Sequence, residues 1–84
     1  MEYYKIIANR ITGLCRQRKL SINQLAKMAN LKQSSIDNII HGRSKNPKAK
    51  TLHKIAYAFG MSFSEFVDFP EMDEVVFEND NESD

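Results

Sequence analysis

Two serine-based capping boxes restrict this chain to short helices, because each one sets the residue at which a helix begins. Ser21 is followed three residues later by Gln24, and Ser62 by Glu65. In such a pair, the serine hydroxyl and the side chain three residues on each accept a hydrogen bond from a backbone N–H that the first helical turn leaves free. We therefore expect one helix to begin just after Ser21 and another just after Ser62.

The helix before the first capping box is predicted from hydrophobic periodicity. Apolar residues recur at helical spacing from about Tyr3 to Arg18. Gly13 weakens this helix by about 1 kcal/mol relative to alanine, so tertiary packing must hold it. The second helix should end by Asn30, because asparagine tolerates the left-handed backbone that turns a chain sharply.

A third helix and a loop are predicted next. A short turn at residues 30–32 leads to a helix over residues 33–40, and Gly42 suits its C-terminal end. Residues 43–48 are polar and basic, and their proline discourages a helix. We expect this segment to be a loop.

The remaining helices complete the expected fold. A fourth helix is predicted over about residues 49–59, with Gly60 after it. The fifth should end near Phe69, because Pro70 cannot continue it. The sequence therefore predicts an all-α class: a compact five-helix domain over residues 1–69.

The net charge of +1 conceals a strong asymmetry along the chain. Residues 1–69 hold all 12 lysines and arginines against four acidic residues, which gives a charge of +8. Residues 70–84 hold seven acidic residues and no basic one, which gives −7. A basic domain prefers polyanions, and we expect the acidic segment to be a flexible tail. Such a tail either keeps the protein soluble or competes with the polyanion for the basic surface.

Several classes of protein are disfavoured by the composition. Cys15 is the one cysteine, so neither an intramolecular disulfide nor a cysteine-based zinc site can form. The two histidines, His41 and His53, lack close metal-ligating companions, and three glycines provide no phosphate-binding loop. We expect no metal, no cofactor and no enzymatic activity. No apolar run is long enough for a membrane span and no signal peptide is evident, so we expect a soluble, cytoplasmic protein.

The spacing of the second and third helices indicates a DNA-binding element. Two helices of about eight residues joined by a three-residue turn are typical of a helix-turn-helix, whose second helix can enter the major groove. The basic charge of residues 1–69 agrees with a polyanionic partner. We therefore expect the helix at about residues 33–40 to face double-stranded DNA.

The same region resembles the lambda-repressor-like, Cro/C1-type (Xre) family of DNA-binding domains. The resemblance spans residues 20–66 and rests on a distributed set of positions: Leu20, Ser21, Gln24, Leu25, Ala26, Leu31, Ser35, Ile36, Ile39, Gly42, Pro47, Thr51, Leu52, Lys54, Ile55, Ala56, Phe59, Gly60, Met61, Ser62, Glu65 and Phe66. It implies a lambda-repressor-like fold.

The sequence departs from the family pattern in three ways. Cys15 and Ile40 stand where members often carry a buried Arg–Glu pair, and an apolar pair can replace such an ion pair without loss. Lys32 and Lys48 stand where the family prefers a serine cap. Either the two helices that follow are less well capped, or the lysines contact the DNA backbone instead. Asn30 replaces the usual turn glycine.

Four residues are candidates for base contacts: Lys32, Gln33, Ser34 and Asn38. The amides of Gln33 and Asn38 can make bidentate contacts with adenine N6 and N7. Ser34 can reach a base edge or a phosphate, and Lys32 a guanine or a phosphate. Asp37 lies beside them with the wrong charge for phosphate, and either accepts from a cytosine N4 or orients a neighbour.

Phosphate contacts are expected from the flanking segments. Arg43, Lys45 and Lys48 would clamp the DNA backbone from the loop, together with backbone amides near Asn23 at the start of the second helix.

The family resemblance implies a sequence-specific transcriptional regulator, a repressor more often than an activator, that binds double-stranded DNA as a homodimer. The alternative is an antitoxin-like or other protein-interaction module. In that case the apolar residues within the acidic tail would bind a protein partner: Phe69, Met72, Val75, Val76 and Phe77.

Overall fold

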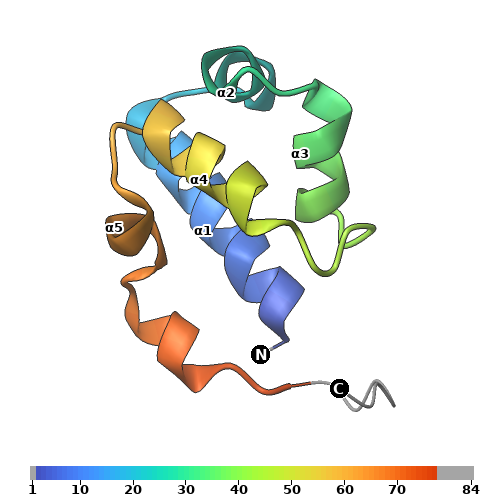
Figure 1. The fold of residues 1–84 in the computed structure, drawn as a ribbon, viewed down its shortest axis with the longest axis vertical. Coiled ribbons are helices and arrows are strands. Elements are labelled where there is room, and N and C mark those ends of the chain that lie inside the picture. Colours follow the sequence, from blue (N-terminus) through green and yellow to red (C-terminus); the bar gives the residue numbers. More distant parts are fainter. Residues whose placement is uncertain (1, 78–84) are drawn as a thin grey trace.

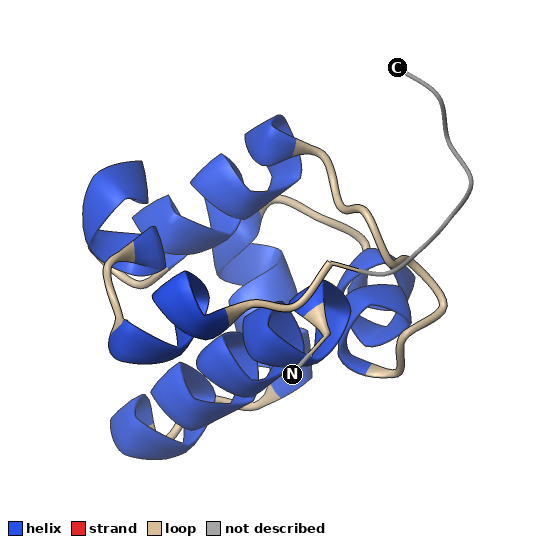
Figure 2. Ribbon diagram, turned by 90° about the horizontal axis from the view of Figure 1, so that it is seen from below, coloured by secondary structure: helices blue, strands red, loops and turns tan. Residues whose placement is uncertain are grey.

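Five α-helices and one 3₁₀ helix make up the part of the chain that the structure, a computed structural model, describes, which is residues 2–77 (Figure 1). The fold class predicted from the sequence, a five-helix all-α domain, is confirmed (Figure 2). The elements are α1 (Tyr3–Arg18), α2 (Ile22–Ala29), α3 (Gln33–Ile40), α4 (Ala49–Ala58), α5 (Phe63–Val67) and the 3₁₀ helix η1 (Pro70–Glu74).

Both predicted capping boxes are formed. The Ser21 hydroxyl accepts from the Gln24 N–H at 3.0 Å, and Gln24 Oε1 accepts from the Ser21 N–H at 2.8 Å. Ser62 and Glu65 repeat the arrangement at 3.1 and 2.9 Å. These reciprocal bonds set the starts of α2 and α5. The lysines before α3 and α4 make no such side-chain cap.

Left-handed residues end the helices where the sequence predicts sharp turns. Asn30 follows α2 with a φ of 57°, and Gly42 and Gly60 have φ values of 76° and 73°. Lys19 adopts the same conformation after α1, with a φ of 56°. Lysine carries no turn signal, so nothing at that position in the sequence indicated this conformation.

The core lies between α1 and the four helices that surround it. Figure 1 shows α2 across one end of α1 and α4, with α3 on one side and α5 on the other. The fully buried side chains come from all five helices or from the residue just after α4: Ile7, Ile11, Leu25, Ile36, Ile55, Phe59 and Phe66. Burying such side chains stabilises each helix by about 1.5–3 kcal/mol per residue.

Two arginines of α1 bind the carbonyl groups at the ends of α4 and α5. Arg18 donates to the Phe59 carbonyl oxygen and lies 5.6 Å from the centre of that ring. Arg10 donates to the carbonyl oxygens of Phe66 at 2.8 Å and Glu65 at 3.1 Å. Terminal carbonyl groups lack helical partners and carry partial negative charge, so a cation there is favourable. Both guanidinium groups are thus used within the fold.

The first part of the expected acidic tail packs on the domain. Within η1, Met72 is half-buried against the core, and its N–H donates to the Phe69 carbonyl oxygen at 3.0 Å. Farther on, Val76 forms an isolated parallel bridge with Glu2. Pro70 excludes an α-helix from its preceding turn but fits the first turn of η1. Residues 78–84 of the predicted tail lie outside the described residues, and the division of the chain after residue 69 stays a prediction.

The three glycines provide a graded test of backbone strain and close packing. A Cβ added at Gly42 would lie 2.7 Å from Tyr4 Cε2. A Cβ added at Gly60 or Gly13 would have no such neighbour within 4 Å. We expect Gly13→Ala to stabilise the helical position by about 1 kcal/mol. Gly60→Ala should destabilise by about 1–2 kcal/mol through its left-handed backbone, and Gly42→Ala by more, because the Tyr4 ring must also move. Urea unfolding measures all three. An equal cost at Gly42 and Gly60 would show that the Tyr4 contact constrains nothing.

The second capping box predicts a dependence of stability on pH. Hydrogen bonds from the Ser62 backbone N–H, and next from its hydroxyl, hold the pKa of Glu65 below its usual range. This stabilisation is present above the unfolded-state pKa of about 4.3 and is lost as the pH falls through the lower folded-state pKa. We expect the free energy of unfolding to fall more steeply below about pH 4.3 in the wild type than in Glu65→Gln. Glutamine keeps the cap, as Gln24 does in α2, so parallel pH curves would contradict the prediction.

Candidate nucleic-acid interface

The turn between α2 and α3 sets the direction of α3 relative to α2. Asn30 takes the left-handed conformation, and the Leu31 N–H donates to the Ala26 carbonyl oxygen at 2.9 Å. Leu31 packs against the core, as do Ile36 and Ile39 of α3. Because α3 buries this face, its polar side chains lie on the opposite, more exposed side.

The predicted base-contacting residues occupy the exposed face of α3 and its start. Lys32, Gln33 and Ser34 are exposed, and Asn38 is half-buried farther along the helix. Asn23, at the start of α2, is also exposed. The structure therefore leaves all of these side chains accessible.

A chain of side-chain hydrogen bonds connects α2 to the start of α3. Asn23 Nδ2 donates to Gln33 Oε1 at 2.9 Å, and Gln33 Nε2 lies 3.5 Å from Asp37 Oδ2. The first bond has an ordinary length and the second is at the limit of a hydrogen bond. Together they fix the orientation of the Gln33 amide, and Asp37 takes the orienting position that was one of its two predicted roles.

The C-terminal end of α3 is joined to the basic loop. Arg43 Nε donates to Asn38 Oδ1 at 2.8 Å, and the Ser44 N–H donates to the Asn38 carbonyl oxygen at 2.9 Å. Arg43 and Asn38 were predicted to contact different parts of DNA, and the structure brings them together.

The loop rests on the start of α1. The Tyr4 ring packs against Gly42, and Lys45 Nζ lies 5.3 Å from the centre of that ring. Nothing in the sequence connected Tyr4 with a loop some forty residues later. Tyr4 therefore positions residues of the candidate interface without belonging to it.

A shallow hollow of about 350 Å³ lies between α3, the loop and α4. Its lining includes the predicted Asn38 and Lys48, and also residues that sequence reasoning did not select: Ser35, Ser44, Asn46 and Thr51. Ser35 and Thr51 belong to the family pattern, but none of the four carries a charge or follows a pattern that marked it as a DNA contact. They extend the polar surface from α3 to the start of α4.

The segment that carries the candidate interface is rich in positive charge. Residues 27–54 hold seven lysines and arginines against Asp37 alone. The first turns of α3 and α4 add the positive ends of two helix dipoles, and neither is capped by a side chain. Free backbone N–H groups at such ends bind anions, including phosphate.

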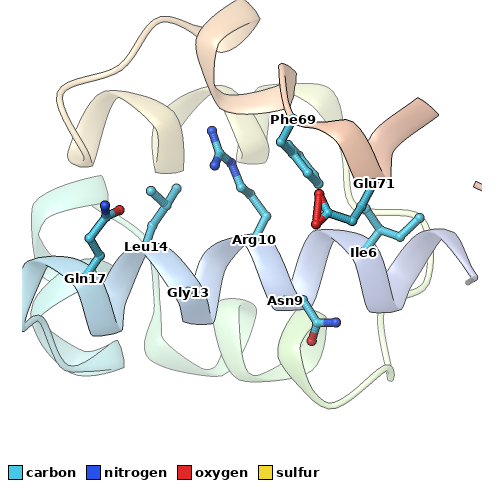
Figure 3. Close-up of a pocket in the computed structure, with 8 residues that line it drawn as sticks. All are labelled: Ile6, Asn9, Arg10, Gly13, Leu14, Gln17, Phe69 and Glu71. Carbon is cyan, nitrogen blue, oxygen red and sulfur yellow. The ribbon is translucent and has the colours of Figure 1, made fainter. Parts of the chain in front are cut away.

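A second hollow, of about 300 Å³, lies between α1 and η1 (Figure 3). Figure 3 shows Arg10 rising from α1 beside Phe69, and the guanidinium carbon of Arg10 lies 4.7 Å from the centre of the Phe69 ring. Cys15 is buried elsewhere in the core, and burial raises the pKa of its thiol, which disfavours the reactive thiolate. Among residues 2–77, no three histidine, cysteine or acidic residues are grouped so as to hold a metal ion.

No helix within the described residues is both long and apolar enough to cross a membrane.

Comparison with known proteins agrees with the geometry. Residues 10–71 match the model of the Cro/C1-type HTH DNA-binding domain. The fold is similar to that of prophage Lp1 protein 11, with a TM-score of 0.77 and 34% identity over 89% of this chain and 100% of that one. It is also similar to an HTH_3 family transcriptional regulator from Vibrio cholerae, with a TM-score of 0.70 and 32% identity over 77% of this chain and 36% of that one. No curated protein sequence matches this chain.

Proposed function

The chain belongs to the Cro/C1-type helix-turn-helix DNA-binding family, and from this we propose that it is a sequence-specific transcriptional repressor that reads the major groove with α3. The observation that carries the proposal is the hydrogen-bonded orientation of Gln33 on the exposed start of α3. An amide held in one orientation before binding loses less conformational entropy when it meets a base.

Base readout begins at the N-terminal end of α3. Gln33 Oε1 accepts from Asn23 and keeps a second lone pair for an adenine N6 amine, while Nε2 can donate to adenine N7. Ser34 and Lys32 lie beside it and contact a base edge or a flanking phosphate. Asn38 extends the contact to the next turn of the helix.

Phosphate contacts position α3 in the groove. Lys45 and Lys48 project from the loop and from the start of α4, and the backbone amides near Asn23 lie at the other end of α3. Such contacts set the register of a protein on DNA but do not read sequence.

Repression follows from occupying an operator as a homodimer. An aromatic cluster on the outer side of α4 and α5 supports the dimer: Tyr57 is 67% exposed, and the His53 ring lies 4.7 Å from it and 5.5 Å from the Phe63 ring. Exposed aromatic residues are enriched at protein interfaces. A second copy covering this cluster would give the symmetric pair of α3 helices that an inverted repeat requires.

In vitro selection from random duplex DNA at near-physiological salt tests the proposal. We expect the wild type to enrich an inverted repeat with half-site centres about one helical turn apart. Gln33→Ala should lose about 1–3 kcal/mol of discrimination at one base pair per half-site. The matched control, Lys48→Ala, should weaken binding to all sequences and reduce the log–log salt slope by about 0.9 per lost phosphate contact.

Two results would contradict parts of this proposal. Salt-sensitive binding without any enriched sequence would exclude sequence-specific regulation. Enrichment of one isolated half-site would exclude the homodimer while leaving the role of α3 intact.

A second candidate function is favoured by two exposed apolar residues in the acidic segment. Val76 is 63% exposed and Phe77 is 77% exposed, beside Glu74 and the bridge to Glu2. An apolar pair among acidic residues, held at the start of α1, suits a basic protein partner with a hydrophobic pocket, as an antitoxin-like module requires.

A reporter gene placed behind the selected operator separates the two functions. We expect Gln33→Ala with Asn38→Ala to abolish repression, because the base contacts are lost. The double variant Val76→Ser with Phe77→Ser should leave repression unchanged, because it changes exposed residues only and leaves Met72 packed against the core. The opposite pattern would make protein interaction through the tail the main function.

A further inference from the structure

The contact between Arg43 and Asn38 is held by the backbone around it. Gly42, with its φ of 76°, turns the chain back toward α3, and the Ser44 N–H bonds to the Asn38 carbonyl oxygen at 2.9 Å. Tyr4 packs beneath Gly42 and limits the path of the loop. Arg43 is therefore returned to the side of α3 on which Asn38 lies, instead of extending into solvent.

This contact changes what Asn38 offers to a base. Its amide oxygen accepts from the Arg43 guanidinium at 2.8 Å, a length typical of a charge-assisted hydrogen bond. The second lone pair of Asn38 Oδ1 lies beside the guanidinium charge, which disfavours the approach of a further amine donor. Asn38 Nδ2 keeps two hydrogens, and the terminal nitrogens of Arg43 keep theirs. The pair thus presents N–H donors and a positive charge to whatever approaches it.

The edges of adenine and guanine differ in how they meet such a surface. Guanine presents two acceptors, N7 and O6, in the major groove, whereas adenine presents the N7 acceptor and the N6 amine, which is a donor. A positive, donor-rich surface attracts the guanine edge and repels the adenine amine. An isolated asparagine has the opposite preference, because its free oxygen accepts from adenine N6.

We propose that Arg43 and Asn38 act as one reading unit that selects guanine over adenine at the base pair facing Asn38, with Arg43 as a specificity-determining residue. The inference rests on the proposed DNA-binding function and deepens it. It separates the two ends of α3. Gln33, whose oxygen takes a neutral amide donor from Asn23, reads adenine, and Asn38 reads guanine through its charged neighbour.

Selection from random duplex DNA, followed by titration of single-base variants of the enriched site, tests the pair. We expect the wild type to prefer guanine over adenine about tenfold or more at one base pair in each half-site, the effect of a good bidentate contact. Arg43→Ala removes the guanidinium charge from beside the Asn38 oxygen and should move the preference at that position to adenine. Arg43→Lys keeps the charge but lacks the planar fork, so it should keep the salt slope and lose most of the preference.

Lys45→Ala is the matched control within the same loop. Its ammonium lies over the Tyr4 ring and has no hydrogen bond to α3 among the described contacts. It should weaken binding to every sequence equally and leave the preferred base unchanged.

The outcomes distinguish this inference from the function on which it rests. An enriched site whose preferred bases are the same in the wild type and Arg43→Ala, with a salt slope smaller by about 0.9, would make Arg43 a phosphate contact and overturn the reading unit alone. An enriched wild-type site with adenine at that position would also overturn it. Absence of any enriched site in the wild type would refute both the proposed function and the reading unit.

Discussion

Each short helix must bury one apolar face in the core that it shares with α1, and the rest of this structure depends on this constraint. The helices α2 to α5 have 5 to 10 residues each, which is below the length at which isolated helices persist in water. Their stability therefore comes from packing. Because Ile36 and Ile39 must face the core, the side of α3 that carries Gln33 and Asn38 is forced outward. The candidate DNA-reading surface is thus a consequence of core packing.

The features that the sequence predicted correctly are those encoded locally. Ser21 with Gln24 and Ser62 with Glu65 set helix starts within four residues, and Asn30 and Gly42 end helices through their own backbone preferences. The sequence did not reveal features that need two distant segments. Arg10 binds a carbonyl group 56 positions away, and no local pattern distinguishes it from a solvent-facing arginine. The packing of η1 on α1 was missed for the same reason.

The same distinction between local and distant features applies to the candidate site. Hydrogen-bonding chemistry and helical position were enough to nominate Gln33 and Asn38 from sequence. Their partners were not predictable, because Asn23 belongs to another helix and the return of Arg43 depends on the turn at Gly42. The net charge predicted from the sequence was likewise an incomplete guide to the site. It counts all cations alike, whereas Arg10 and Arg18 bind helix carbonyls and the loop cations stay exposed.

In the proposed mode of DNA binding, recognition by α3 is therefore a property of the helix together with its supports. At its N-terminal end, α2 orients Gln33 through Asn23. At its C-terminal end, the loop supplies the charge that gives Asn38 a different chemistry, and α1 holds that loop through the contact of Tyr4 with Gly42. The side-chain amides of Gln33 and Asn38, which have the same chemical group, then present different donor and acceptor patterns to DNA. The base that an amide selects is decided by what its oxygen already binds, so identical residues on α3 of a relative need not read identical DNA.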